Sequence, residues 1–144
     1  MEEISNQNQS NIKPQLRSRS RRILRYIIKK HLQSQKYAWR GLYEIFQNQL
    51  NFKIQLSIGF VVIILGVFFE ITKIEWVIIS FLITLVLVSE AFNSSIEAMC
   101  DALSKEYNEN IRYTKDVAAG AVLLSAILSI IIGMSIFLPY ILSL

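Results

Sequence analysis

The sequence has few of the residues from which soluble active sites are usually assembled. Among its 144 residues are one cysteine, one histidine and five glycines. The single cysteine, Cys100, excludes a disulfide within this sequence, and packing is the role we expect for it. The single histidine, His31, is interpreted as a solvated or headgroup residue. Because the glycines form neither a Walker A loop nor a GxGxxG fingerprint, the sequence supports no soluble type of nucleotide-binding fold.

Charge is also scarce. Charged residues make up 18% of the chain and hydrophobic residues 53%, and the mean hydropathy is +0.40, which is too apolar for an ordinary soluble domain. The apolar runs occupy residues 56–69, 76–89 and 117–144. A membrane-spanning helix needs about 20 residues, and extending the first run back to Leu50 and the second to Met99 brings both to that length. The sequence therefore predicts three transmembrane helices.

Three regions follow one another along the chain. Residues 1–20 are rich in Asn, Gln, Ser and Arg and are predicted to form a disordered basic tail. In residues 21–49 apolar side chains recur at spacings of three and four between basic ones, which is typical of an interfacial amphipathic helix. Residues 50–144 form the predicted three-span domain. We interpret the basic run over residues 17–30 as a topology signal that contacts anionic lipid, rather than as a nucleic-acid-binding segment.

Positive charge predicts how the chain is oriented in the membrane. Residues 1–40 carry ten Lys and Arg against two Glu, a net charge of +8, and the remainder carries five against nine, a net charge of −4. Because basic flanks stay in the cytoplasm, we expect a cytoplasmic N-terminus, an outer turn at Glu70–Glu75, an inner segment at Ser104–Lys115 and an external C-terminus. The predicted location is the inner (plasma) membrane.

The most informative segment is Glu90–Asp101, because it places carboxylates in the second predicted span. At 100° per residue, its polar residues share one helix face about 100° wide. These residues are Glu90, Asn93, Ser94, Glu97 and Asp101. A carboxylate near the bilayer centre costs roughly 2.5–3.5 kcal/mol on insertion scales, so several on one face imply partners, a wet cleft or a bound cation. Glu90 lies about 24 Å past the outer entry near Ile74, so the face should open toward the cytoplasm.

This order of features resembles the prokaryotic diacylglycerol kinase and undecaprenol kinase family, small integral-membrane lipid kinases unrelated to soluble kinases. The resemblance covers about residues 30–138. Its most specific positions are Glu90, Asn93, Ile96, Glu97, Asp101, Glu106, Tyr107, Lys115 and Asp116, followed by Ala118–Leu123. Tyr37–Leu42 and Asn51 with Phe52 match more weakly.

The resemblance implies an all-α membrane protein with an N-terminal interfacial amphipathic helix and three transmembrane helices, assembled as a homotrimer. It implies ATP-dependent phosphorylation of the primary hydroxyl of diacylglycerol or undecaprenol at the inner membrane surface, with Mg²⁺ as cofactor and no nucleic-acid partner. Glu90 would be the general base, and Glu97 and Gln49 would hold the metal. The implied nucleotide contacts are Lys30, Tyr37, Gln49, Glu97, Asp101, Glu106, Tyr107, Asn108, Lys115 and Asp116. The implied lipid contacts are Glu90, Asn93, Lys30 and Ala119.

Three of these positions also have a simpler interpretation. Lys115 could be a topology marker that reaches for the membrane surface, and Tyr107 could be an interfacial anchor. Asp116 could instead pair with Arg112 four residues earlier on a helix.

The sequence departs from the family pattern at three positions. Gln49 stands where a second metal-binding Glu is usual, Lys30 where an Arg is common, and Asn108 where a His often follows Glu-Tyr. Gln49 offers an oxygen but no negative charge, so metal affinity should fall. An inactive family member is therefore one alternative function. A small oligomeric ion-coupled transporter is another, since intramembrane carboxylates also mark ion pathways.

Overall fold

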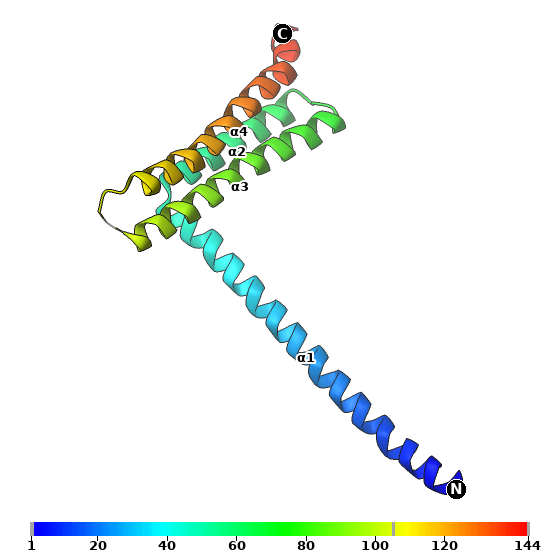
Figure 1. The fold of residues 1–144 in the computed structure, drawn as a ribbon. Helices are drawn as coiled ribbons and strands as arrows, with labels where there is room; N and C mark the ends of the chain where they lie inside the picture. The colour runs from blue at the N-terminus through cyan, green and yellow to red at the C-terminus, as the bar shows by residue number, and fades with distance from the viewer. Residues whose placement is uncertain (1, 105, 144) are drawn as a thin grey trace. The chain divides into compact units, whose positions relative to one another are not determined.

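The computed structural model describes residues 2–104 and 106–143. This part of the chain forms four helices and no strands, which confirms the predicted all-α class (Figure 1). The helices are α1 (Glu2–Asn48), α2 (Leu50–Phe68), α3 (Lys73–Leu103) and α4 (Glu109–Leu142). The chain divides into two compact units at residue 44.

The first unit is the greater part of α1. The helix includes residues 2–20, where composition predicts a disordered tail. Helix propagation adds one hydrogen bond per residue once a nucleus exists, so the helix of the following amphipathic region can extend into a polar stretch. Near the end of this unit Arg40 Nε donates to Glu44 Oε1 at 2.9 Å, an exposed i,i+4 pair that contributes about 0.3–0.5 kcal/mol. The domain boundaries at residues 20 and 49 stay predictions.

The second unit contains the three predicted spans. Each of α2, α3 and α4 is long and apolar enough to cross a membrane, which confirms the count of three. α2 begins at Leu50, as predicted, but α4 begins at Glu109, within the predicted inner segment and eight residues before the apolar run of residues 117–144. The reason is a helix cap, because Asn108 Oδ1 accepts hydrogen bonds from the backbone N–H groups of Asn110 and Ile111.

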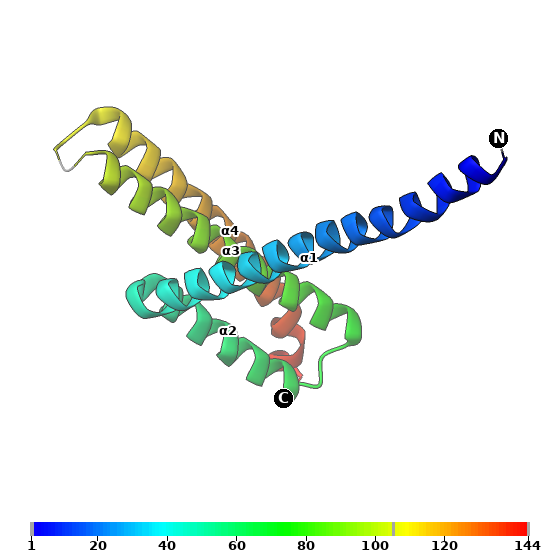
Figure 2. The same cartoon turned by 90° about the horizontal axis from the view of Figure 1, so that it is seen from below.

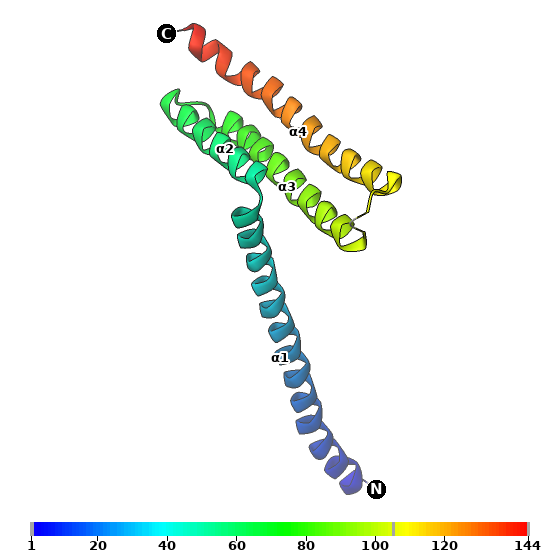
Figure 3. The same ribbon diagram turned by 90° about the vertical axis from the view of Figure 1, so that its left-hand side faces the viewer.

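α3 is the central helix of this unit and packs against both α2 and α4 (Figure 3). The turn between α2 and α3 is short (Figure 2). Ile71 N–H donates to the Gly66 carbonyl and Glu70 N–H to the Val67 carbonyl, at 3.2 and 3.3 Å. This is a Schellman motif in which Glu70, at φ 50°, takes the left-handed position that glycine usually fills. Thr72 then starts α3 with a capping box.

Two glycines allow α2 and α3 to approach closely. A Cβ atom added at Gly66 would lie 2.9 Å from Trp76 Cη2 and 3.1 Å from Ile71 Cδ1, and one added at Gly59 would lie 3.1 Å from Ile83 Cγ2. Both glycines are buried. The interface between α2 and α3 is therefore set by small residues, as is common where helices meet in membranes.

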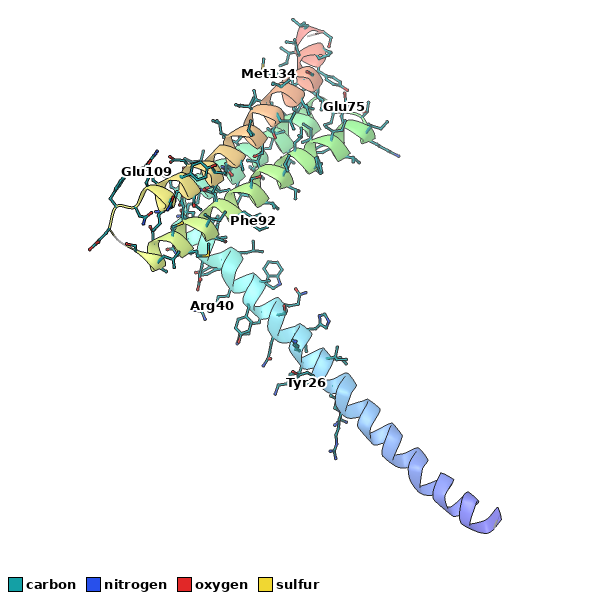
Figure 4. All side chains as sticks on the ribbon, viewed as in Figure 1. Tyr26, Arg40, Glu75, Phe92, Glu109 and Met134 are labelled. Carbon is teal, nitrogen blue, oxygen red and sulfur yellow. The ribbon has the colours of Figure 1, made fainter. Side chains whose placement is uncertain are left out.

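A hydrogen bond ties the end of α4 to the start of α3. Tyr140 Oη donates to Glu75 Oε2 at 2.8 Å, and the same oxygen accepts from the backbone and the hydroxyl of Thr72. The buried side chains beside this end are Ile71, Ile79, Ile136 and Phe137. Glu75 and Glu109 mark opposite ends of the second unit (Figure 4), so this apolar core lies at the end of α3 that is remote from its acidic face.

Candidate active site

The polar face of α3 is buried at the middle of the helix and exposed toward its C-terminal end. Glu90 is 2% exposed, and Asn93 and Ser94 are each 5% exposed. Glu97 is half-buried and Asp101 is exposed. An apolar residue, Phe92, lies on the opposite face and is 67% exposed (Figure 4). The helix thus turns its polar face inward and its apolar face outward, as a helix in lipid should.

A residue of α2 forms a hydrogen bond with the Glu90 side chain. Gln55 Nε2 donates a hydrogen bond to Glu90 Oε2 at 3.1 Å. The Gln55 amide therefore turns its N–H side toward the carboxylate. This leaves Gln55 Oε1 buried without a partner, and Asn93 Oδ1 and Ser94 Oγ are also buried and unpaired among the described residues. Each such atom costs about 1–3 kcal/mol unless water, a ligand or another chain completes its hydrogen bonds.

The Glu97 carboxylate is a side chain that could supply one oxygen ligand to a magnesium ion. Its Oε1 accepts from Asn93 Nδ2 at 3.0 Å, and it lies one turn closer to the exposed end of α3 than Asn93. Gln49 is the extended residue between α1 and α2, and its side chain does not cap α2. In the described part of the chain no three acidic, His or Cys side chains gather into a metal-binding group. Mg²⁺ suits such a place because it is often held by one or two carboxylates, with waters and substrate phosphates as its other ligands.

An ion pair joins α3 to α4 at the exposed end of the polar face. Lys115 Nζ donates to Asp101 Oδ1 at 2.5 Å, and 34% of the Lys115 side chain is exposed. One turn earlier Arg112 Nη1 donates to Asp116 Oδ2 at 2.9 Å, the i,i+4 pair that the sequence offers as the simpler interpretation of Asp116. Arg112 also pairs with Glu109. Exposed pairs of this kind add little to the stability of the protein, because solvent screens them.

The predicted nucleotide contacts between α3 and α4 are solvent-exposed. Glu106 and Tyr107 are exposed, Tyr107 by 79%, and the Tyr107 hydroxyl donates to the Glu109 carboxylate. Asn108 caps α4, a role that its place before Glu109 could have indicated. Ser104 Oγ accepts from Glu106 N–H at 3.1 Å. The short connection therefore presents polar side chains beside the Asp101–Lys115 pair.

The remaining predicted contacts lie on helix surfaces. Lys30 and Tyr37 are exposed residues of α1 in the first unit. Ala119 is exposed on α4, next to buried Ala118. Cys100 is 3% exposed and forms no disulfide, which agrees with the packing role predicted for it.

An apolar groove of about 560 Å³ runs between α2, α3 and α4. Along α2 and the turn after it, its lining begins at Gln55 and reaches Phe69, a length of about 21 Å. On α3 it follows Ile79 to Val86, and on α4 it ends at Ile141. Its lining is apolar apart from two residues, Gln55 and Ser129. The groove therefore ends at the amide that contacts Glu90.

Comparison with known proteins agrees with this architecture. Residues 36–137 match the family described as prokaryotic diacylglycerol kinase, which is more than half of the chain. The chain belongs to the prokaryotic diacylglycerol kinase family. Membership makes it a lipid kinase, and the three helices that could span a membrane identify it as a membrane protein.

Similar proteins of this family come from several organisms. The chain is similar to the undecaprenol kinase of Bacillus subtilis strain 168, at 37% identity over 103 residues, 72% of this chain and 84% of that protein. It is also similar to a diacylglycerol kinase of Synechocystis, at 36% identity over 114 residues, 78% of this chain and 65% of that protein. The diacylglycerol kinase of Escherichia coli K12 is 28% identical over 95 residues, 66% of this chain and 78% of that protein.

The sequence reasoning missed Gln55. The residue stands in the first span, where a buried carboxamide is expensive and therefore a signal of function. The polar residue itself could be noticed in the sequence. Its hydrogen-bond partner could not be predicted, because Glu90 lies 35 residues further along the chain.

Proposed function

We propose that this family member transfers the γ-phosphate of ATP to the primary hydroxyl of diacylglycerol or undecaprenol, with Mg²⁺ as cofactor. One observation carries the proposal: the Glu90 carboxylate is 2% exposed and is held by Gln55, the residue at which an apolar groove ends. A lipid alcohol has a matching order of groups, a hydroxyl followed by a long apolar chain. Both lipids also appear in the names of relatives.

The groove supports a lipid rather than a water-soluble substrate. An apolar chain placed along α2 would cover the groove lining and leave its hydroxyl at Glu90. The groove length of about 21 Å exceeds half of a bilayer hydrocarbon core of about 30 Å. An apolar chain lying along the groove would therefore extend from the depth of Gln55 past the middle of the bilayer.

The chemistry follows from the order of groups on α3. Glu90 removes the proton from the lipid hydroxyl as its oxygen bonds to the γ-phosphorus. The bond from this phosphorus to the oxygen bridging to the β-phosphate breaks, and ADP leaves. Glu97 and Gln49 would hold Mg²⁺, which neutralises charge on the phosphate oxygens when it is bound. Asn93, which lies between Glu90 and Glu97, orients the phosphate or the lipid without adding charge.

Nucleotide contacts are proposed at the exposed end of α3, at the start of α4 and on α1. The positive charge of Lys115 stabilises the negative charge on the phosphoryl group as it is transferred. The proposed contacts are Lys30, Tyr37, Gln49, Glu97, Asp101, Glu106, Tyr107, Asn108, Lys115 and Asp116. For the lipid they are Glu90, Asn93, Lys30 and Ala119.

This end of the helices is proposed to lie at the cytoplasmic face of the plasma membrane, with the C-terminus outside. The net charge of +8 on residues 1–40 supports that orientation, as does the supply of ATP in the cytoplasm. Part of α1 would lie on the inner leaflet. We further propose a homotrimer, because copies of the chain could cover apolar side chains that α2, α3 and α4 leave exposed.

The direct test is transfer of labelled phosphate from ATP into extractable lipid. Purified protein in mixed micelles, with Mg²⁺, should phosphorylate diacylglycerol, undecaprenol or both. The control is the same protein with the metal chelated, which should give no product. Folded protein that forms no phospholipid with either alcohol would contradict the proposal and favour an inactive family member or a transporter.

Gln49→Glu should lower the Mg²⁺ concentration for half-maximal activity. At the proposed position the new carboxylate adds a negative charge to a hard-cation site, and Mg²⁺ prefers carboxylate oxygen. A Mg²⁺ titration of activity, with thermal unfolding measured in parallel, tests this. Gln47→Glu is a matched control, because it adds the same charge two residues away and should leave the Mg²⁺ requirement unchanged. Reduced stability of Gln49→Glu with an unchanged or raised Mg²⁺ requirement would remove Gln49 from the site.

A further inference from the structure

We propose that Gln55 is a positioning residue for the general base. It holds one oxygen of the Glu90 carboxylate so that the other oxygen is the one that receives the substrate proton. The inference rests on the proposed function, in which Glu90 acts as the base, and it adds a residue of α2 to a site that the sequence assigns to other elements.

The geometry gives the two carboxylate oxygens different roles. Gln55 Nε2 donates to Glu90 Oε2 at 3.1 Å, and within the described residues no hydrogen bond reaches Glu90 Oε1. The terminal torsion of a glutamate is broad, so without a fixed donor the carboxylate samples many orientations. The bond from Gln55 narrows this range. It leaves Oε1 as the oxygen that can accept from a lipid hydroxyl.

Among the described residues, no hydrogen bond joins Glu90 to a cation of the neighbouring helices. The lysine of α2 that lies nearest in sequence, Lys53, donates to the Gln47 carbonyl at 2.9 Å. On α4, Lys115 donates to Asp101. Within the described residues, the buried carboxylate therefore depends on one neutral donor for its orientation.

A purely structural role explains Gln55 less well. Gln55 joins α2 to α3 through only one of its two polar atoms, because within the described residues its Oε1 is buried and has no partner. The other polar residue of the groove, Ser129, does satisfy its hydroxyl, which donates to the Ser125 carbonyl at 2.8 Å. Burying this amide oxygen without a hydrogen-bond partner costs about 1–3 kcal/mol. The oxygen lies at the point where the substrate is proposed to bind.

Two variants test the inference by steady-state kinetics. Gln55→Met keeps the approximate shape and removes the donor, and Gln55→Asn keeps the amide but shortens its reach by one carbon. Both should lower kcat by about 10- to 100-fold, because misplacing a catalytic group by about 1 Å can cost up to 100-fold. The KM for ATP should not change. Ser57→Ala is the matched control, since Ser57 is exposed on the same helix and, within the described residues, its hydroxyl donates only to the Lys53 carbonyl.

The outcomes separate this inference from the proposed function. Wild-type kcat in either folded Gln55 variant would overturn the positioning role. A raised KM for the lipid at unchanged kcat would also overturn it and make Gln55 a lipid contact. If Gln55→Met does not fold, Gln55→Asn decides, because a packing role predicts lost stability with normal kcat per folded molecule. An inactive wild-type protein would instead contradict the proposed function.

Discussion

Glu90→Gln should lower kcat by about 10²- to 10⁴-fold, the usual range for loss of a general base. The substitution is nearly isosteric, and the new amide oxygen can still accept the hydrogen bond that Gln55 donates to Glu90. The buried packing is therefore kept, and only the ability to take a proton is lost. ATP affinity should remain near the wild-type value. Turnover in mixed micelles and equilibrium nucleotide binding measure the two effects separately.

Glu75→Gln is the matched control for this prediction. It makes the same chemical change on α3, but Glu75 lies at the opposite end of the helix, where it binds Thr72 and Tyr140. Its loss should reduce thermal stability without changing kcat per folded molecule. A Glu90→Gln protein with wild-type kcat would refute the assignment of Glu90 as the base.

Lys115→Met should lower kcat by about 10²- to 10³-fold, a range typical for loss of one preorganised group that stabilises transition-state charge. Lys115 is partly buried and already held by Asp101 at 2.5 Å, so its ammonium group is fixed near the exposed end of the polar face. Lys115→Arg should recover part of the lost activity because it keeps the charge. Initial rates at saturating ATP measure both effects.

A structural role for Lys115 makes a different prediction. If the lysine only pairs with Asp101 or marks the membrane surface, Lys115→Met should lose stability and retain kcat. Lys73→Met, which removes an exposed lysine from the other end of α3, controls for the lost positive charge. Full activity of folded Lys115→Met would contradict the catalytic role of Lys115 and favour its interpretation as a topology marker.

The helices could be predicted from hydropathy because a spanning helix satisfies its backbone hydrogen bonds internally. That reasoning correctly predicted that α2 starts at Leu50 and that three helices could span a membrane. It placed the start of α4 too late, since apolar runs mark where a helix enters lipid and not where it begins in water. The beginning was set by a local cap, Asn108, whose effect does not depend on hydropathy.

Part of the candidate site could be predicted in the same way. Helical periodicity alone put Glu90, Asn93 and Glu97 on one face, and the spacing of Arg112 and Asp116 alone indicated their ion pair. These relations are local, because residues three, four or seven apart on one helix share a face whatever surrounds the helix. The Asp101–Lys115 pair is different, since it depends on how α3 and α4 meet.

By itself the sequence determined the elements of this protein: three apolar spans, a basic N-terminal region and a row of polar groups on the second span. These features follow from composition and helical periodicity. Only the tertiary structure decided how deeply Glu90 is buried, that Gln55 is its partner and that an apolar groove ends there. The reason is that contacts between α2 and α3 depend on their register, which close packing at Gly59 and Gly66 sets and which no pattern within either helix encodes.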